Sequence, residues 1–514
     1  MDLNYTHLLN RAARTAGDRA ALVDDTGVMT YPALTRLTDR FANALLAAGL
    51  RPSDSFAVLS PNTSLALASL LGGLKAGGAW SNINLRSAPA INVDILDRGE
   101  CKALFIHSQA APLLDEIRAG VTSLRIVVCL DTDLDGVPSL ASFCEGASEA
   151  PCNVELAADA VGFQGSTGGT TGAPKITQGG SAFLAWNTLG FMADMPFDAP
   201  PVNLAVAPIT HAGGVVAMAT LALGGTVVLM PAADLGLILS NIEKHRVSWL
   251  FLPPTLIYML MNHPDCRTTD FSSLRYLMSA AAPFATEKIA QAREMFGPVI
   301  CQSFGQTESG FPLTFMSPAA MNQALDEPDK AHRLLSVGLM SASVADLGIM
   351  GEDGKLLPPG EVGELVVRGP TTMFRYKDDP DATAAIQNGG WQHTGDLGSI
   401  DADGFVYISD RKRDLIISGG FNVFPLEVEQ VLAAHPAVQD SAVIGVPDEK
   451  WGEAVKAVVE LAPGQNVEAA ELIQLCRDKL GPVMAPKSVD FTETLPRSAV
   501  GKVLKRELRD RYRG

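Results

Sequence analysis

Residues 165–175 read Gly-Ser-Thr-Gly-Gly-Thr-Thr-Gly-Ala-Pro-Lys. Glycines let a backbone approach an anion closely, with several N–H groups pointing inward. The serine and the threonines add hydroxyl donors, and Lys175 adds a point charge suited to phosphate. The stretch therefore predicts a phosphate-binding loop, although composition alone also allows a flexible connection between strands. It is not a Walker A loop, because Gly172 is followed by Ala173 and not by lysine.

Length and composition restrict the class of protein. The 514 residues are too many for one ordinary core, so two or more domains are expected. Hydrophobic residues make up 47% and charged residues 19%, which is typical of soluble globular proteins. The net charge of -17 argues against a nucleic acid or an anionic membrane as partner. The most apolar stretch, residues 215–230, is short and holds Gly224-Gly225, so it predicts a helix, a turn and a strand, with no transmembrane segment.

Cysteine usage indicates the compartment. The seven cysteines are scattered, form no CxxC pair and are odd in number. This pattern predicts reduced thiols, no zinc site and a cytoplasmic location. The first residues, Met-Asp-Leu-Asn, show no signal peptide.

Helical and strand patterns alternate through the first part of the chain. Helices are expected at residues 31–50 and 64–76, and strands at 56–59, 103–106 and 125–128. Such alternation predicts largely parallel sheets covered by helices. Residues 203–211 are also expected to form a buried strand that ends at a histidine. Glycine-flanked strands between Gly338 and Arg368 predict a small β subdomain, and strand–helix alternation returns after residue 440.

A second motif, Val-Ile-Cys-Gln-Ser-Phe-Gly-Gln-Thr-Glu, occupies residues 299–308. A short strand leads to a glycine turn and then to the hydroxyl of Thr307 and the carboxylate of Glu308. A carboxylate beside a triphosphate needs a cation between them. Mg²⁺ is commonly shared between a carboxylate and phosphate oxygens. The motif thus predicts a magnesium-assisted nucleotide site.

Three later stretches are individually ambiguous. Residues 391–398 read Trp-Gln-His-Thr-Gly-Asp-Leu-Gly, where the aspartate is by itself an ordinary turn residue. Residues 410–414 read Asp-Arg-Lys-Arg-Asp, and such a charge run is usually a solvated surface. Residues 496–502 read Pro-Arg-Ser-Ala-Val-Gly-Lys, where a lysine near a basic terminus is usually just exposed.

Taken in order, these stretches resemble the motifs of the adenylate-forming (ANL) superfamily, in its acyl-CoA synthetase or fatty-acid–CoA ligase branch. The resemblance spans nearly the whole chain. It implies an α/β fold with a large N-terminal domain of α/β subdomains plus a small β-barrel-like subdomain, and a small mobile C-terminal α+β lid domain. The implied boundaries are residues 1–409 for the N-terminal domain, 410–413 for the hinge, with Arg413 at the pivot, and 414–514 for the lid.

The resemblance also implies the ligands and the residues that bind them. Phe304 stands where a tyrosine is commoner and would stack on adenine, and Asp396 would accept the ribose hydroxyls. Gly419, Gly420 and Phe421 would line the tunnel for CoA. The implied ATP- or AMP-binding residues are Ser166, Thr167, Gly168, Gly169, Thr170, Thr171, Lys175, Ala281, Ala282, Pro283, Ser303, Phe304, Gly305, Thr307, Asp396 and Arg411.

Four residues are implied to act in catalysis. Thr307 would bind the α-phosphate, Glu308 would hold Mg²⁺, and Lys502 would be the lysine that stabilises charge during adenylation. His211 would lie beside the acyl pocket as a gate. An acid would attack the α-phosphorus of ATP, giving acyl-AMP and pyrophosphate, and CoA would then take the acyl group.

The implied pocket suits a bulky hydrophobic carboxylic acid, such as an aryl, fatty or polycyclic acid. An α-amino acid is disfavoured because residues 210–214 hold no carboxylate to pair with its ammonium. Residues 176–180 also lack the Ser/Thr-His pair common in relatives. The pocket residues would be His211, Ala212, Gly213, Gly214, Val215, Ala280 and Phe311.

Two other functions stay open at this stage. A ligase could load the thiol of a separate carrier protein in place of CoA, since no carrier domain is visible. The chain could instead be a catalytically silent nucleotide-binding protein, against which Lys175, Glu308 and Lys502 weigh together. The assembly is open between a monomer and a homodimer.

Overall fold

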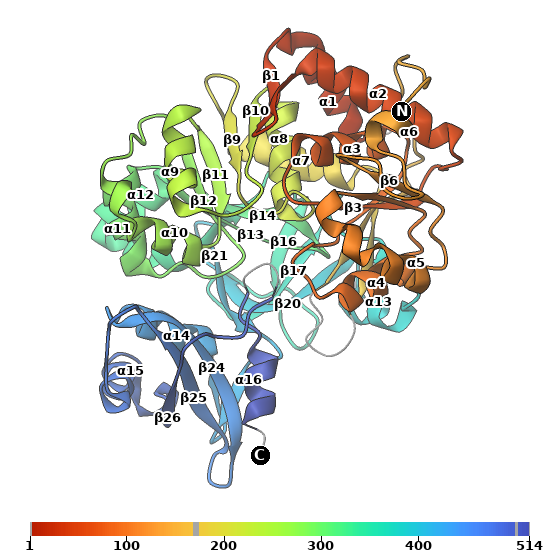
Figure 1. The fold of residues 1–514 in the computed structure, drawn as a ribbon. Coiled ribbons are helices and arrows are strands. Elements are labelled where there is room, and N and C mark those ends of the chain that lie inside the picture. The colour runs from red at the N-terminus through yellow and green to blue at the C-terminus, as the bar shows by residue number, and fades with distance from the viewer. Residues whose placement is uncertain (1–2, 168–173, 499–501, 513–514) are drawn as a thin grey trace.

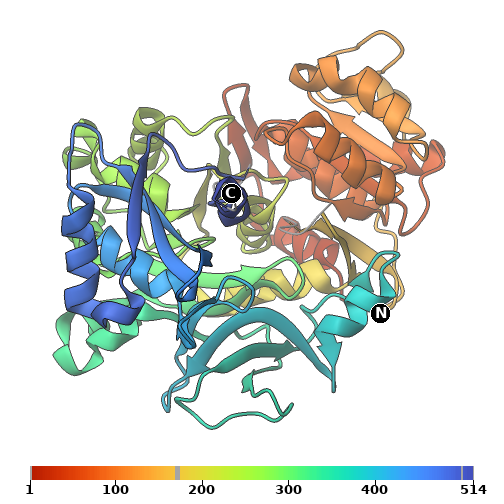
Figure 2. The same ribbon diagram turned by 90° about the horizontal axis from the view of Figure 1, so that it is seen from below.

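The structure is a computed structural model that describes residues 3–167, 174–498 and 502–512. Its strands form one sheet of fourteen, one of seven and one of five within those ranges. The first two sheets belong to a large unit, and the third belongs to a small C-terminal unit (Figure 1). Figure 2 shows the small unit, in blue, in front of the green elements of the large one.

The largest sheet changes character along its width. The part of the sheet from β16 (Asp346–Met350) to β13 (Ile300–Gln306) is antiparallel, and the remainder is mainly parallel. In sheet order its strands are β16 (Asp346–Met350), β17 (Gly363–Arg368), β20 (Trp391–Ile400), β21 (Val406–Arg411), β15 (Ser336–Met340), β14 (Gly310–Met316), β13 (Ile300–Gln306), β12 (Tyr276–Ser279), β11 (Trp249–Leu252), β9 (Val202–Ala205), β10 (Thr226–Leu229), β1 (Ala20–Asp24) and β2 (Gly27–Thr30), with β19 (Gln387–Asn388) beside β20.

The second sheet carries the glycine-rich motif at one side. Five of its strands are parallel, and β8 and β18 pair antiparallel beyond them. In sheet order its strands are β18 (Arg375–Tyr376), β8 (Ile176–Gly180), β7 (Val161–Ser166), β4 (Ala79–Ser81), β3 (Ser55–Leu59), β5 (Ala103–Ile106) and β6 (Ile126–Cys129). The expected strands at 56–59, 103–106 and 125–128 are thus confirmed to within one residue.

Helices cover both sheets of the large unit. Their buried apolar side chains form one core with side chains from strands of both sheets. Helix α2 begins with the hydroxyl of Thr30 accepting the N–H of Ala33, and α8 is apolar on nearly every side, as expected of a helix packed within a core. The helices are α1 (Tyr5–Ala16), α2 (Tyr31–Ala47), α3 (Ser64–Lys75), α4 (Pro89–Arg98), α5 (Leu114–Gly120), α6 (Leu140–Phe143), α7 (Phe183–Asp194), α8 (Ala212–Ala222), α9 (Leu235–Lys244), α10 (Pro254–Met261), α11 (Thr286–Phe296), α12 (Pro318–Asp326) and α13 (Pro380–Ile386), with 3₁₀ turns η1 (Ser108–Leu113), η2 (Pro264–Arg267) and η3 (Pro328–Leu335).

One expected strand ends earlier than predicted. The stretch 203–211 forms β9 only to Ala205, and His211 stands instead directly before α8. Pro208 has no N–H to donate to a ladder, which explains why the strand does not reach the histidine. The expected helix, turn and strand over 215–230 are confirmed as α8 and β10. Within the described residues no helix is long and apolar enough to cross a membrane.

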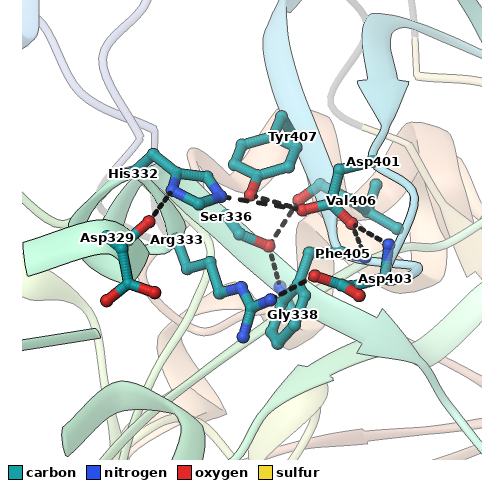
Figure 3. Close-up of polar contacts among 10 residues, drawn as sticks. All are labelled: Asp329, His332, Arg333, Ser336, Gly338, Asp401, Asp403, Phe405, Val406 and Tyr407. Carbon is teal, nitrogen blue, oxygen red and sulfur yellow. Dashed lines mark hydrogen bonds and ion pairs between the residues drawn. The ribbon is translucent and has the colours of Figure 1, made fainter. Parts of the chain in front are cut away.

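The predicted small β subdomain joins the large sheet through pairing of β15 with β21. The hairpin turn between β20 and β21 is held by η3 (Figure 3). The guanidinium of Arg333 lies 4.4 Å from the ring centre of Phe405 and pairs with Asp403. The hydroxyl of Tyr407 donates to Oδ2 of Asp401 over 2.9 Å. These contacts fix the turn that leads into β21 and then into the charge run.

The small C-terminal unit packs helices α14 and α15 on one face of its sheet. Their buried aliphatic residues, among them Val428 and Leu472, meet Val443 and Val455 of the long hairpin. Its elements are β22 (Ile416–Ser418), β23 (Phe421–Val423), α14 (Pro425–Ala433), β24 (Val438–Asp448), β25 (Gly452–Leu461), α15 (Ala469–Met484), β26 (Ser488–Thr492) and α16 (Lys505–Arg511). The predicted fold class, a large α/β unit with a small α+β unit, is confirmed. The boundaries at 409, 413 and 414 stay predictions.

Candidate active site

The base of the glycine-rich loop is tied to the neighbouring strands. The loop joins β7 and β8, and the predicted Gly168, Gly169, Thr170 and Thr171 lie outside the described residues. At its base the N–H of Thr167 donates to the carbonyl of Lys175 over 2.9 Å. The N–H of Ser166 donates to Oδ1 of Asn82 over 2.6 Å. The Lys175 ammonium lies 4.7 Å from the ring centre of Tyr376.

The Thr-Glu motif lies against this loop. It forms the turn between β13 and β14, and the packing is so close that a Cβ on Gly165 would lie 2.1 Å from Cγ2 of Thr307. Oε1 of Glu308 accepts the hydroxyl of Tyr376 over 3.0 Å. The ring of Tyr376 therefore stands between the predicted phosphate-binding lysine and the predicted metal-binding carboxylate. The structure brings the first two motifs together, as the sequence predicted.

Asp396 and Arg411 face each other across the pairing of β20 and β21. Nε of Arg411 lies 3.3 Å from Oδ1 of Asp396, whose side chain is only 4% exposed. Oδ2 of Asp396 is buried and has no hydrogen-bond partner in the described part of the chain. Burial raises the pKa of Asp396 to about 6, although Arg411 and Lys502 pull the other way. A buried carboxylate oxygen without a donor suits a ligand hydroxyl.

Lys502 reaches the same cluster from the small unit. The carbonyl of Lys502 accepts the N–H of Ser498 over 2.8 Å. Its charge is attracted by Asp396 and Glu308 and repelled by Arg411. Loss of hydration and the repulsion by Arg411 place the pKa of Lys502 below its ordinary value, even though much of the side-chain surface is exposed. Residues from three distant motifs therefore share one electrostatic field.

The positions predicted to hold adenine differ among themselves. Ala281, Ala282 and Pro283 form an exposed loop after β12, and Ala281 has φ of 74°, a strained value for a residue with a Cβ. The hydroxyl of Ser303 is buried and donates to the carbonyl of Thr314 over 2.8 Å, which gives it a structural role within the sheet. Phe304 is half-buried and packs against aliphatic side chains of β14, β16 and β17.

Gly305 marks a close approach between two strands. A Cβ there would lie 2.6 Å from the carbonyl oxygen of Gly310. The glycine therefore lets β13 turn tightly into the Thr-Glu motif, which accounts for its place in the motif irrespective of nucleotide contact.

The predicted acid pocket lies at the start of α8. Burial lowers the pKa of His211 to about 4, so its imidazole is neutral at pH 7. A Cβ on Gly213 would lie 2.6 Å from the carbonyl oxygen of Ala207, and one on Gly214 would lie 2.1 Å from that of Ile209. These glycines are thus required by the backbone that precedes the helix. Ala280 is buried in an apolar cluster, and Val215 and Phe311 pack against that cluster.

The predicted CoA residues lie elsewhere on the small unit. Gly419, Gly420 and Phe421 form the tip of the hairpin between β22 and β23, and Phe421 is 60% exposed. The N–H of Gly419 donates to the carbonyl of Trp451 over 2.8 Å, so the tip is held by its own sheet. In this arrangement the small unit instead presents the charge of Lys502, which interacts with Asp396 and Glu308.

Comparison with known proteins gives the family. The family model of the AMP-binding enzyme matches residues 9–377, and that of the AMP-binding enzyme C-terminal domain matches residues 427–502. The chain belongs to the AMP-binding enzyme family. The predicted membership of the adenylate-forming superfamily, in its acyl-CoA synthetase branch, is confirmed.

Relatives of this AMP-binding enzyme are described for different acids. Feruloyl-CoA synthase from an Amycolatopsis species is 35% identical over 505 residues, which cover 98% of each chain. A long-chain-fatty-acid–CoA ligase from Mycobacterium tuberculosis is 32% identical and covers 94% of this chain and 93% of its own. Among solved structures, the amide bond synthetase McbA from Marinactinospora thermotolerans has a TM-score of 0.89 at 29% identity and covers 99% of this chain and 100% of its own. Membership of the family therefore does not identify the acid that this chain activates.

The structure adds polar residues that the sequence patterns did not reveal. A cavity of about 400 Å³ adjoins Glu308 and Tyr376. On its wall Glu364 lies 3.1 Å from Nδ1 of His393 and 3.1 Å from Nζ of Lys412. Burial opposes ionisation of Glu364, but hydrogen bonds from His393 and Lys412 and the charge of Lys412 lower its pKa. No local signal identifies this cluster, because its members come from β17, β20 and the charge run.

The donor set agrees with a magnesium ion shared with phosphate. Within the described ranges no group of three or more His, Cys, Asp or Glu side chains could hold a metal ion alone. Glu308 offers one carboxylate beside the phosphate loop, and Mg²⁺ is usually bound by one or two carboxylates together with substrate phosphates. The residues present therefore fit the ion only when ATP supplies the other oxygens.

Proposed function

We propose that this AMP-binding enzyme is an ATP-dependent acyl-CoA ligase that activates a bulky hydrophobic carboxylic acid. The reaction class is that of its relatives, and the chain is an acid–thiol ligase. ATP and CoA are substrates of such ligases. The identity of the acid, the role of each residue and the participation of Mg²⁺ are the parts that we propose.

One observation carries the proposal. Lys502 of the small unit shares an electrostatic field with Glu308, Asp396 and Arg411 of the large unit. An ammonium, a guanidinium and two carboxylates around the base of a phosphate loop suit a substrate that carries both a polyphosphate and ribose hydroxyls. A purely structural junction would have no reason to leave Oδ2 of Asp396 buried and without a partner among the described residues.

In the first step, a carboxylate oxygen of the acid attacks the α-phosphorus of ATP. The bond to the β-phosphate oxygen breaks, and pyrophosphate leaves. Thr307 donates to the α-phosphate, and the Lys502 ammonium stabilises the charge that builds on the α-phosphate oxygens. Lys175 and the loop hold the leaving pyrophosphate, while Asp396 fixes the ribose. Holding both reactants in line supplies much of the rate.

Magnesium would be held by Glu308 together with phosphate oxygens, and it would neutralise charge on the departing pyrophosphate. The hydroxyl of Tyr376, 3.0 Å from Oε1 of Glu308, orients the carboxylate for this task. The apolar cluster around Ala280 and Phe311 would exclude water from the acid and its adenylate.

In the second step, the CoA sulfur attacks the acyl carbonyl, and AMP leaves. Gly419 and Gly420 have positive φ angles of 60° and 84°. Two such residues without side chains suit a backbone whose N–H groups pass close to the pantetheine arm. The lid would have to turn about Arg413 to bring this hairpin to the acyl-AMP. A neutral His211 would gate the entry without adding charge to the acyl pocket.

The acid class rests on the side chains of the proposed pocket. Phe311 lies 5.2 Å from Phe191 and 5.7 Å from Phe251, between ring centres. Such a wall favours an aryl, fatty or polycyclic acid over a short polar one.

The seven unpaired cysteines support a cytoplasmic location, and we propose a homodimer only as an alternative to the monomer.

The direct test is pyrophosphate release across aryl, fatty, dicarboxylic and polycyclic acids, with ATP and Mg²⁺ and with or without CoA. We expect acid-dependent release and an acyl-CoA product detected by mass for a hydrophobic acid. Release that is independent of CoA would instead indicate a carrier-protein thiol or an amine as acceptor. Absence of release with every acid, while ATP still binds, would contradict the proposed ligase.

A further inference from the structure

A buried carboxylate links the large unit to the lid at the end of β21. Asp410 is 5% exposed. Its Oδ1 accepts the N–H of Arg411 over 2.6 Å, and its Oδ2 accepts the N–H of Leu426 over 2.9 Å. Leu426 lies in the first turn of α14, where backbone N–H groups have no partner within the helix. Asp410 therefore holds the start of a lid helix from outside that helix.

The same carboxylate attracts the helix that follows Lys502. Nζ of Lys505, at the start of α16, lies 2.8 Å from Oε1 of Glu429 on α14. Oε1 of Glu429 also accepts the N–H of Val443 over 2.7 Å. The charge of Lys505 is stabilised by both Glu429 and Asp410. One negative charge from β21 thus supports α14 and α16 together (Figure 1).

The position of Lys502 depends on α16. Leu508 of this helix is 1% exposed and packs on the lid sheet, and Arg509 pairs with Asp414. Only two residues separate Lys502 from Lys505, a chain segment too short to absorb a large displacement. A shift of α16 relative to β21 would therefore move the Lys502 ammonium away from Asp396.

The positions of these residues along the chain show which contacts a rotation of the lid would break. Asp410 precedes Arg413, the proposed pivot, whereas Leu426, Glu429 and Lys505 follow it. Rotation of the lid about that point would separate Asp410 from the residues that it holds. By contrast, Arg509 and Asp414 both follow the pivot and would move together.

We propose that Asp410 is a positioning residue that holds the lid in the orientation for adenylation, through the N–H of Leu426 and the charge of Lys505. This inference rests on the proposed two-step function. Because rotation of the lid would break these contacts, the effect of Asp410 falls on the first step and spares the second, in which the lid has to leave this orientation.

The test compares the two half-reactions in Asp410→Ala. The first is acid-dependent ATP–pyrophosphate exchange, and the second is acyl-CoA formation from supplied acyl-adenylate and CoA without ATP. We expect the exchange rate to fall by about tenfold, the size associated with a lost hydrogen bond to a charged group, and the second rate to stay or rise. Asp410→Asn keeps an acceptor for Leu426 but loses the attraction for Lys505, so its loss should be smaller. Asp410→Glu should recover part of the exchange.

An equal fall in both half-reactions, or no change in either, would overturn the proposal. Asp346→Asn is the matched control, because Asp346 forms an exposed ion pair with Arg368 between β16 and β17 of the large unit. Hydrogen exchange of the enzyme without substrates supplies a readout independent of activity. Asp410→Ala should speed exchange in residues 502–512, and unchanged exchange there would refute positioning even if the wild type proved inactive on every acid.

Discussion

Replacing Asp396 by asparagine should stabilise the protein while weakening its hold on ATP. The pKa of this buried carboxyl rises from 3.8 to about 6, mainly through desolvation. That rise corresponds to about 3 kcal/mol of unfavourable free energy for the charged form at neutral pH. The folded protein binds this proton more tightly than the unfolded chain, so stability from this group is lost as the pH rises from about 4 to about 6. Asparagine cannot ionise and avoids that loss.

The assay is the unfolding midpoint of wild type and Asp396→Asn, without nucleotide, between pH 4.5 and 7.5. We expect the variant to unfold at higher temperature at pH 7.5, with the difference shrinking toward pH 4.5. ATP should bind more weakly to the variant, because an amide replaces a carboxylate as acceptor for the ribose. Asp346→Asn, at an exposed ion pair, should show no such pH trend. A variant that is less stable at pH 7.5, or a difference independent of pH, would refute the desolvation argument.

Three further changes test the geometry of the site. Gly165→Ala places a Cβ 2.1 Å from the neighbouring threonine and should abolish most pyrophosphate release, whereas Gly236→Ala, with its nearest atom at 3.5 Å, should not. Tyr376→Phe removes the donor to Glu308 and should raise the Mg²⁺ concentration needed for half-maximal rate by about tenfold, and an unchanged requirement would contradict that role. Lys502 has a lowered pKa and must be cationic to act, so the kcat/KM of adenylation should begin to fall at a pH below the ordinary pKa of lysine. Lys502→Ala should lack this alkaline decrease in its pH profile.

Local patterns in the sequence were sufficient for much of the fold. Alternating helices and strands predicted α2, β3, α3 and β5 because each carries its own periodicity and end signals. The motifs around Glu308 and Lys502 were likewise visible because they are continuous in sequence. Their order along the chain made the family resemblance possible, and the family models confirm it.

Contacts between distant side chains could not be read in the same way. The hydroxyl of Tyr376 reaches Glu308 across 68 residues, and Lys505 reaches Glu429 across 76. Such pairs depend on how strands are ordered in a sheet and leave no mark on local hydrophobic spacing. Even a local boundary was missed at β9, which ends at Ala205, well before the histidine. Likewise, only the fold shows that Oδ2 of Asp396 is buried and that no group in the described ranges donates to it.

In the proposed mechanism the lid lysine acts on an acid and ATP held by the large unit. The most direct measurement is acid-dependent ATP–pyrophosphate exchange by wild type and Lys502→Ala, with ATP binding measured on the same samples. We expect the variant to bind ATP but to lose nearly all exchange, because the charge on the α-phosphate is no longer stabilised. Exchange by Lys502→Ala at the wild-type rate would show that the lysine does not act in adenylation.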